Sequence, residues 1–277
     1  MGYDEEVPRV PETSGEPSAE ATADRRLGGR LGLAAAAAFL VAVPFTLLLF
    51  LVESSWEPLE DLDRSAARRL HQTALEHGWL VDLLNVVSIV FDPWVFRVTC
   101  LLVALWLWRR GAPRLAAWAA VTTVVAGALG GLLKLLVHRV RPVLDDPVAH
   151  ANGYSFPSGH ALGSLVGTGV LILVFLPVLG RTGRWAAYGG GALVVLMTGF
   201  SRIGLGVHFV SDVLAGWVVG LACLAATSAA FEVWRREEGR PASTPGQGVE
   251  PEAAGVIDDG NSPDRADGAP VTRPAGK

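Results

Sequence analysis

His208 and Asp212 stand four residues apart in the stretch SRIGLGVHFVSDVLAG of this 277-residue chain. On a helix, side chains four residues apart share one face, so the carboxylate can hold one imidazole nitrogen and raise the basicity of the other. That arrangement suits a histidine that acts as a nucleophile. A pair at this spacing also occurs in purely structural helices, so its meaning depends on the residues that gather around it.

The stretch YSFPSGHALGSL has the residues of a helix start beside a titratable ring. Pro157 and Ser158 precede an apolar segment, and Gly159 leaves the backbone uncovered. Proline and serine are typical of a helix N-terminus, whose free amide groups bind phosphate oxygens well. An ordinary capped helix would show the same three residues. His160 adds a ring that could protonate a leaving oxygen beside such an anion site.

The stretch LLKLLVHRVRPVLDDP carries basic residues. Lys134 lies one to two turns inside the end of an apolar segment, and Arg141 and Pro142 follow seven and eight residues later. The chain contains 21 arginines but two lysines, Lys134 and the C-terminal Lys277. In so arginine-rich a sequence, a lysine within an apolar segment indicates a site that needs a compact ammonium group. Arg139 is interpreted as a contact to lipid headgroups.

No metal site is expected from the spacing of the other possible ligands. A metal site at His208 would need further ligands, and the spacing does not supply them at His71, His77, His138 or His150. Cys100 and Cys223 fall within apolar runs, where a small buried side chain is the expected role. The sequence therefore predicts chemistry without a metal or a cofactor.

Long apolar segments must position these residues. Hydrophobic residues make up 51% of the chain, a composition typical of an integral membrane protein. Six candidate spans are predicted, at residues 31–52, 92–109, 115–137, 160–179, 185–204 and 209–234. Between the first two, residues 61–90 mix leucines with charged residues and predict an interfacial helix followed by a short apolar one. The predicted fold class is therefore all-α, a polytopic membrane bundle of six helices.

The two ends of the chain lack any hydrophobic period. Residues 1–29 and 237–277 are rich in Pro, Gly, Ser, Ala and acidic residues, so both are predicted to be disordered tails. The membrane domain is predicted at 30–236. Because more than half of the acidic residues lie in the tails, this domain is basic. A basic domain suits an anionic substrate or anionic lipid headgroups, and no nucleic-acid partner is expected.

Arginines flank alternate ends of the predicted spans. They cluster at residues 25–30, 109–114, 181–184 and 235–236, as the positive-inside rule requires of cytoplasmic loops. Both termini of this cell-membrane protein are therefore predicted to be cytoplasmic. The ionisable residues left at the outer ends of spans three to six are Lys134, Arg141, His160, Arg202, His208 and Asp212. Because charged groups at membrane depth are costly, their convergence predicts one functional site at the extracytoplasmic face.

Together these stretches resemble the three-part signature of the type 2 phosphatidic acid phosphatase family. The parts are Lys134-x6-Arg141-Pro142, then Pro157-Ser158-Gly159-His160, then Ser201-Arg202-x5-His208-x3-Asp212. Vanadium haloperoxidases and bacterial acid phosphatases share this signature. All three parts are complete and in order, and the resemblance covers about residues 31–234.

The resemblance implies a role for each matching residue. His208 would attack phosphorus and form a phosphohistidine while Asp212 orients it, and His160 would protonate the leaving group and then activate water. The residues implied to surround the nonbridging oxygens are Lys134, Arg141, Ser158, Gly159 and Arg202. Fixed cations and amides can stabilise the charge of phosphoryl transfer without a metal.

The signature indicates a phosphate and leaves the lipid open. Undecaprenyl diphosphate is the first expectation, with phosphatidic acid or phosphatidylglycerol phosphate as alternatives, and a lipid-linked phosphotransferase would use the same residues. From a different class, the chain could be a non-catalytic lipid-binding protein, although intact His160, His208 and Asp212 argue against this. Whether residues 53–91 cover the site is not decided by the sequence.

Overall fold

The structure is a computed structural model that describes residues 42–243 and 245–258. Within these ranges every regular element is helical, so the all-α prediction is confirmed for the described part of the chain. The tail predicted at 1–29 and residues 259–277 of the second predicted tail lie outside the described residues.

Five helical segments of the described chain are long and apolar enough to cross a membrane. They are α3 with α4 (Gly78–Val90 and Pro93–Arg110), α5 (Pro113–Val137), α6 with η1 (Gly159–Phe175 and Leu176–Val178), α7 (Arg181–Gly204) and α8 (Val210–Glu237). The last five predicted spans match α4, α5, α6 with η1, α7 and α8 to within a few residues, and α3 extends the first of these segments beyond the predicted 92–109. Of the first predicted span, 31–52, residues 31–41 lie outside the described residues, and the described part is helical over Ala42–Glu53. A sixth span therefore stays a prediction.

Local capping explains why α4 and α5 begin and end where they do. The Asp92 carboxylate accepts a hydrogen bond of 2.8 Å from the Trp94 amide, and Pro93 occupies the first helical position. Gly111 ends α4 at a φ of 89°, a left-handed conformation that glycine adopts without steric cost. Pro113 then begins α5.

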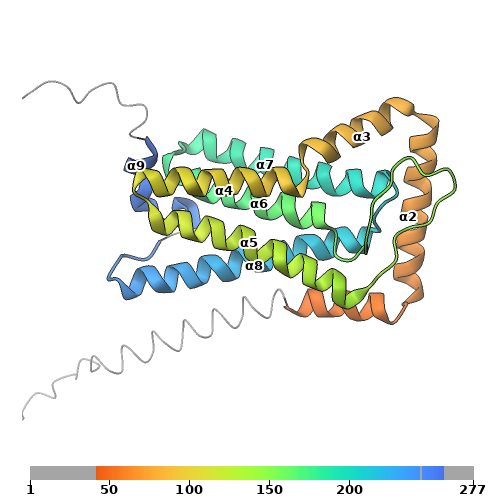
Figure 1. The fold of residues 1–277 in the computed structure, drawn as a ribbon, viewed down its shortest axis with the longest axis horizontal. Helices are drawn as coiled ribbons and strands as arrows, with labels where there is room; N and C mark the ends of the chain where they lie inside the picture. The colour runs from red at the N-terminus through yellow and green to blue at the C-terminus, as the bar shows by residue number, and fades with distance from the viewer. Residues whose placement is uncertain (1–41, 244, 259–277) are drawn as a thin grey trace, which may run out of the picture.

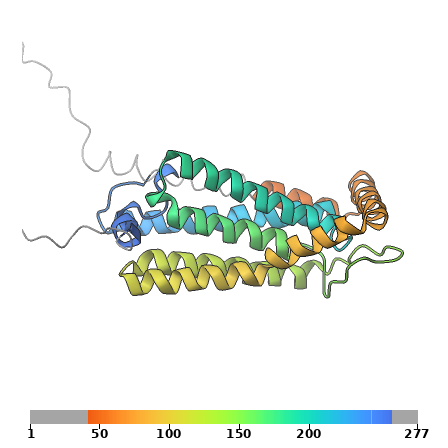
Figure 2. The same cartoon turned by 90° about the horizontal axis from the view of Figure 1, so that it is seen from above.

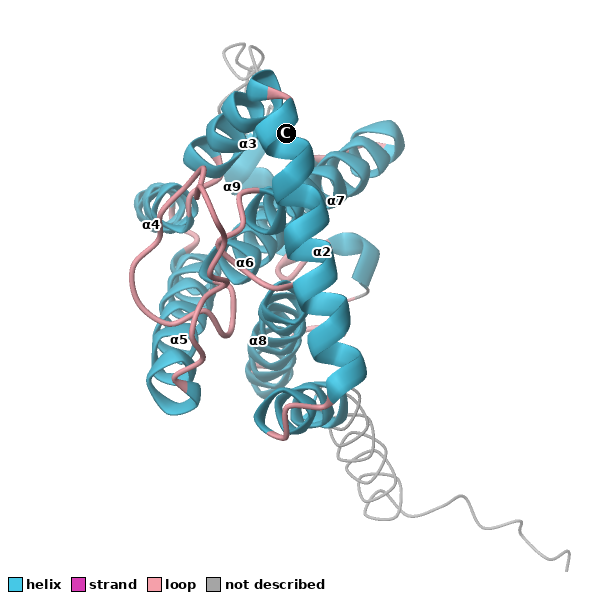
Figure 3. Ribbon diagram, turned by 90° about the vertical axis from the view of Figure 1, so that its right-hand side faces the viewer, coloured by secondary structure: helices cyan, strands magenta, loops and turns pink. Residues whose placement is uncertain are grey.

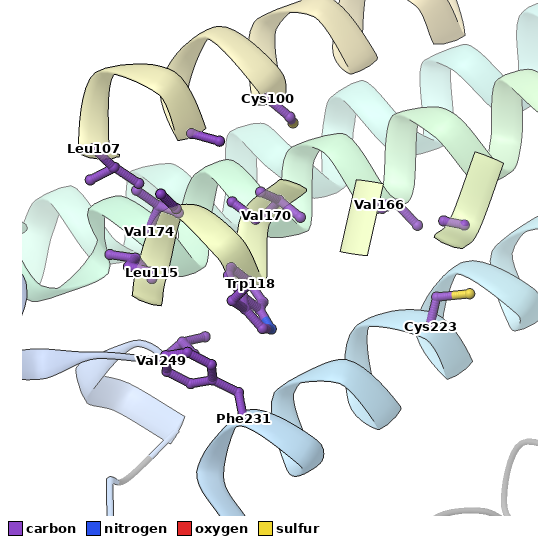
Figure 4. Close-up of a cluster of buried hydrophobic side chains, with 14 of the residues drawn as sticks. Cys100, Leu107, Leu115, Trp118, Val166, Val170, Val174, Cys223, Phe231 and Val249 are labelled. Carbon is purple, nitrogen blue, oxygen red and sulfur yellow. The ribbon is translucent and has the colours of Figure 1, made fainter. Parts of the chain in front are cut away.

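The long helices α4 to α8 run side by side, with α6 in contact with α4, α5, α7 and α8 (Figures 1 and 2). Side chains mainly from α4, α5, α6 and α8 form the main buried cluster, which includes Cys100, Val166, Val170 and Cys223 (Figure 4). Both cysteines are therefore buried packing residues, as expected. At Gly216 of α8, an added Cβ would lie 2.7 Å from the Ser158 carbonyl oxygen. The absence of a side chain there lets α8 approach the start of α6 closely.

The helix α2 (Glu57–Glu76) lies across one end of the bundle, nearly perpendicular to the long helices (Figures 1 and 3). Its face toward the bundle is a stripe of small and polar residues at helical spacing: Asp63, Ala67, His71 and Ala74, all buried. Leu62 and Leu75 point outward and are about half exposed. The sequence predicted an amphipathic helix here, and the structure adds that its small-residue face packs against protein.

The loop between α5 and α6 folds back under α2. The His71 imidazole of α2 lies 2.7 Å from the Asp145 carbonyl oxygen, and the amide of Ser155 donates to the Arg139 carbonyl at 2.8 Å. A second buried cluster of Leu84, Leu205 and Val207 packs against this loop at residues 148–151. These contacts place the Arg141 and His208 segments beside each other.

The segment after α8 corrects the prediction of a disordered tail from residue 237. At the end of the bundle opposite α2, the described residues up to Asp258 fold back onto the helices and include η2 (Pro245–Gln247), η3 (Pro251–Ala253) and α9 (Ala254–Asp258) (Figures 1 and 2). Arg235 is 1% exposed and its guanidinium pairs with Glu252 at 2.5 Å and with Glu232 at 3.0 Å. A buried guanidinium requires such partners. The Pro- and Gly-rich composition of the segment concealed this packing.

Candidate active site

All eight residues predicted to form the site lie at the end of the bundle that α2 covers. The alternation of antiparallel helices explains this, because the end of α5, the start of α6, the end of α7 and the start of α8 meet there. The positions are Lys134 near the end of α5, Arg141 in the following loop, Ser158, Gly159 and His160 at the start of α6, Arg202 near the end of α7, and His208 and Asp212 around the start of α8.

His208 and Asp212 contact each other, but not across a helix face. His208 precedes α8, and Asp212 occupies the third helical position, from which its Oδ2 turns back to accept the Phe209 amide at 2.9 Å. The same oxygen lies 3.3 Å from Nδ1 of His208, and both side chains are almost wholly buried. The predicted pairing is therefore present with a different local geometry, in which Asp212 also satisfies the free amide of Phe209 at the helix start.

The contact with Arg141 indicates which tautomer His208 adopts. Nη1 of Arg141 lies 3.0 Å from Nε2 of His208 and also donates to the Val207 carbonyl at 2.7 Å. A guanidinium can only donate hydrogen bonds, so Nε2 accepts and the ring proton resides on Nδ1, facing Asp212. The imidazole lone pair therefore points toward Arg141.

Burial lowers the pKa of the His208 imidazole to about 4, against the opposing effect of the Asp212 carboxylate. We therefore expect His208 to remain neutral as the pH falls from 8 to about 5. The check is a pH titration of 15N-histidine-labelled protein in detergent, with the His208 signals identified by their loss in His208→Ala. A His208 transition near the ordinary value of 6.5 would contradict this expectation.

Lys134 and Arg141 share a backbone acceptor. The Lys134 ammonium donates to the Tyr154 carbonyl at 2.9 Å, and Nη2 of Arg141 reaches the same oxygen at 3.3 Å. An added Cβ on Gly159 would lie 3.9 Å from Cε of Lys134, so the ammonium-bearing chain passes the start of α6. The two cations and this helix N-terminus thus adjoin one another, which favours an anion between them.

Arg202 and His160 meet through a serine that the sequence did not single out. Ser88 of α3 is buried, and its hydroxyl accepts a short hydrogen bond from Nη1 of Arg202. The same hydroxyl lies 3.4 Å from Nε2 of His160, and an Asp92 carboxylate oxygen also lies 3.4 Å from that nitrogen. Ser88 stands alone as a polar residue within the run VVSIV, which was the available signal.

Ser158 links two parts of the site. Its amide donates to the Asp212 carbonyl at 2.9 Å, and its hydroxyl oxygen caps α6 by accepting the Ala161 amide at 3.5 Å. The serine is wholly buried. The cap uses a lone pair of the hydroxyl oxygen and leaves its hydrogen for an acceptor.

The interpretation of Arg139 as a lipid headgroup contact is wrong. Its Nη1 donates to Oδ1 of Asp212 and to the Ser211 hydroxyl, both at 2.6 Å, and its Nη2 donates to Asp63 at 2.9 Å. The guanidinium also lies over the Phe209 ring, 4.5 Å from its centroid. Arg139 is drawn inward because two buried carboxylates need a cation between them.

A cavity of about 520 Å³ adjoins the site on the α2 side. Its walls include Arg68 and Gln72 of α2 together with Pro142 and Phe209, the neighbours of Arg141 and His208. Residues 53–91 thus lie against the site through α2 and α3. In the part of the chain that the structure describes, no group of three or more His, Cys, Asp or Glu side chains is arranged as a metal site.

Three comparisons place this arrangement among known proteins. The sequence pattern of the PAP2 superfamily matches residues 115–236. Phosphatidylglycerophosphatase B of Bacillus subtilis (strain 168) is 38% identical over 96 residues, which are 34% of this chain and 46% of that protein. The chain thus matches about half the length of this relative. Undecaprenyl-diphosphatase BcrC of the same organism is 31% identical over 152 residues, 52% of this chain and 72% of that protein.

The fold also has a counterpart among solved structures. A crystal structure described as the first transmembrane PAP2 type phosphatidylglycerolphosphate phosphatase from Bacillus subtilis superposes with a TM-score of 0.59 at 22% identity. The superposition covers 70% of this chain and 97% of that one. At this identity the likeness concerns the fold alone. With the matched sequence pattern and a relative aligned over 72% of its length, this chain belongs to the PAP2 superfamily.

Proposed function

We propose that this chain is a membrane phosphatase that transfers the terminal phosphoryl group of a lipid phosphate or diphosphate first to His208 and then to water. The observation that carries the proposal is the orientation of His208. Its Nδ1 faces the Asp212 carboxylate at 3.3 Å, and its Nε2 lone pair faces the Arg141 guanidinium at 3.0 Å. A bound phosphate would accept the Arg141 hydrogen bonds in place of Nε2, which would free this lone pair to attack phosphorus beside a fixed cation.

The proposed reaction has two steps. Nε2 of His208 attacks the terminal phosphorus, and the bond from that phosphorus to the bridging oxygen breaks. The leaving group is a lipid alkoxide from a monophosphate or a lipid phosphate from a diphosphate, and its oxygen takes a proton from His160. A water molecule then attacks the phosphohistidine, gives a proton to His160, and breaks the phosphorus–nitrogen bond to release inorganic phosphate. Asp212 stabilises the positive charge that develops on the imidazole in the first step.

Three cations would stabilise the transferring group. Lys134, Arg141 and Arg202 approach the site from α5, the following loop and α7, and the amide of Gly159 lies at the start of α6. The transition state of phosphoryl transfer spreads charge over three nonbridging oxygens, and fixed cations and amides stabilise that charge without reorganisation.

The site would face the extracytoplasmic side. Arginines of the α4–α5 connection, the start of α7 and the end of α8 lie at the end of the bundle away from the site, at residues 109–114, 181–184 and 235–236. The positive-inside rule assigns that end to the cytoplasm. Both termini would then be cytoplasmic.

Undecaprenyl diphosphate is the proposed substrate, and phosphatidylglycerol phosphate is the second candidate. The name of one relative favours each candidate: BcrC is called an undecaprenyl-diphosphatase, and the other relative is called a phosphatidylglycerophosphatase. Phosphatidic acid is a further alternative, and an acceptor other than water would make the same site a phosphotransferase.

The test is phosphate release by the purified protein in detergent and EDTA, with undecaprenyl diphosphate, phosphatidylglycerol phosphate and phosphatidic acid offered side by side. We expect activity to persist in EDTA, to be inhibited by vanadate, and to be greatest on undecaprenyl diphosphate. Loss of activity on chelation and its return with a divalent ion would refute the metal-independent mechanism. A higher kcat/KM on phosphatidylglycerol phosphate would assign the second candidate instead.

The role of His160 predicts an effect that depends on the leaving group. A good leaving group departs without a proton, whereas a lipid alkoxide needs one. We expect His160→Ala to reduce kcat/KM, which reports the first step, by about 10²- to 10⁴-fold on a lipid monophosphate and far less on p-nitrophenyl phosphate. Equal losses on both substrates would argue against proton donation by this residue.

A further inference from the structure

The helix α2 contributes a buried carboxylate that no part of the signature contains. Asp63 is 1% exposed although it belongs to a helix that crosses the end of the bundle. Its Oδ1 accepts the Ser211 amide at 3.0 Å, and its Oδ2 accepts the Ser211 hydroxyl at 2.5 Å and Nη2 of Arg139 at 2.9 Å. Both carboxylate oxygens are therefore used at the start of α8.

Arg139 connects this carboxylate to Asp212. One guanidinium nitrogen donates to Asp63 and the other donates to Oδ1 of Asp212 at 2.6 Å. Oδ1 is thereby occupied, and Oδ2 alone faces His208 and the Phe209 amide. The position of the catalytic carboxylate thus depends on a cation that a second carboxylate holds in place.

We propose that Asp63 and Arg139 are positioning residues for His208: Asp63 orients the Arg139 guanidinium, and Arg139 fixes Asp212 so that the imidazole keeps its proton on Nδ1. The inference rests on the proposed function, since it assigns His208 as the nucleophile. The helix α2 then belongs to the active site, because its Asp63 carboxylate is needed to position the nucleophile.

Charge balance supports this assignment over a purely structural one. Asp63 and Asp212 are both buried, and Arg139 lies between them with 16% of its side chain exposed. Without the guanidinium, two buried carboxylates would face each other through Ser211, and one would take up a proton. A protonated Asp212 could no longer stabilise an imidazolium.

The first test compares Asp63→Asn with Asp61→Asn, an exposed position two residues earlier on α2. In the carboxylate both oxygens accept hydrogen bonds from Ser211 and Arg139, whereas an asparagine amide has one accepting oxygen and an NH₂ group that only donates. At least one of these donors therefore loses its acceptor. We expect Asp63→Asn to lower kcat by about 10- to 100-fold, a range typical of groups that orient a functional residue, with KM and the inhibition constant of inorganic phosphate within about threefold. Asp61→Asn is expected to match the wild type.

A double-variant cycle separates positioning from general loss of stability. If Asp63 acts through Arg139, the variant Asp63→Asn/Arg139→Gln should lose no more than about threefold beyond Arg139→Gln alone. Arg139→Lys should lie between the wild type and Arg139→Gln, because lysine keeps the charge but not the fork that reaches both acids. The proposal would be overturned if the loss in the double variant equalled the product of the two single-variant losses. It would also be overturned if Asp63→Asn were as active as Asp61→Asn.

A readout that does not need turnover distinguishes failure of this inference from failure of the proposed function. 15N-histidine spectra of the detergent-solubilised protein report which nitrogen of His208 carries the proton. We expect protonated Nδ1 in the wild type and in Asp61→Asn, and a mixture of tautomers in Arg139→Gln. An unchanged tautomer in Arg139→Gln would refute the positioning role even if no lipid phosphate proved to be a substrate.

Discussion

Replacing His208 with alanine is expected to reduce phosphate release from the preferred lipid phosphate by about 10⁴-fold or more, the scale seen when a nucleophile is removed from a catalytic set that acts as a unit. In the proposed mechanism the imidazole is the group that bonds to phosphorus, and Lys134, Arg141 and Arg202 only bind and stabilise the phosphoryl group. Substrate binding should therefore survive while turnover does not. The measurement is kcat and KM for phosphate release.

The control for this variant is His150→Ala, an exposed histidine in the loop between α5 and α6. It should retain wild-type kcat and KM. Because His208 is 2% exposed and its removal leaves a cavity, thermal unfolding in detergent must show that the alanine variant is folded. A folded His208→Ala protein that turns over within tenfold of the wild type would exclude His208 as the nucleophile.

Asp212→Asn is expected to lower kcat by about 10³- to 10⁴-fold, as for other carboxylates that orient a catalytic histidine. The direction of the asparagine amide follows from Arg139, which can only donate and therefore retains the amide oxygen at the Oδ1 position. The NH₂ group must then face Nδ1 of His208. That nitrogen becomes an acceptor, the ring proton moves to Nε2, and the nucleophilic lone pair is lost.

This variant also separates orientation from binding. The cations around the phosphate remain, so KM and inhibition by inorganic phosphate should change by only about threefold. The NH₂ group additionally leaves the Phe209 amide without its acceptor, so some loss of thermal stability is expected. A kcat within tenfold of the wild type, in a folded Asp212→Asn protein, would show that Asp212 does not set the tautomer of His208.

The sequence predicted the long helices well because lipid-facing segments carry a strong and local signal. Segments 92–109 to 209–234 correspond to α4 to α8 within a few residues. The sequence also predicted that the eight site residues lie at one end of the bundle, because alternate helix ends must meet on one side of an antiparallel bundle. The short segments that contain these residues were informative because each places an ionisable residue next to apolar sequence.

The supporting residues were missed for a different reason. Asp63, Ser88 and Ser211 act through contacts with residues far away in the chain, which no local spacing reveals. Arg139 was misread because one guanidinium near a membrane surface looks like any other until its partners are known. The stripe from Asp63 to Ala74, at helical spacing and without large apolar residues, was the one local sign that this face of α2 packs against protein.

The tail after α8 shows a similar limit. Its composition predicted disorder, but Arg235 and Arg114 pair with acids of the following segment, including Glu252 at 2.5 Å and Glu250 at 3.8 Å. Each of these pairs forms only because the fold of the bundle brings an arginine of a long helix next to an acidic residue of the following segment. Composition alone therefore could not reveal that this segment packs on the helices.

The most direct measurement of the mechanism is the mass of the peptide that carries His208 after a reaction with lipid phosphate is stopped in alkali, where phosphohistidine survives. The proposed mechanism predicts a transient phosphoryl group on His208 in the wild type. It also predicts none in His208→Ala. Phosphate release by the wild type with the phosphoryl group on another residue, or with direct transfer to water proven by inversion at a chiral phosphorus, would contradict it.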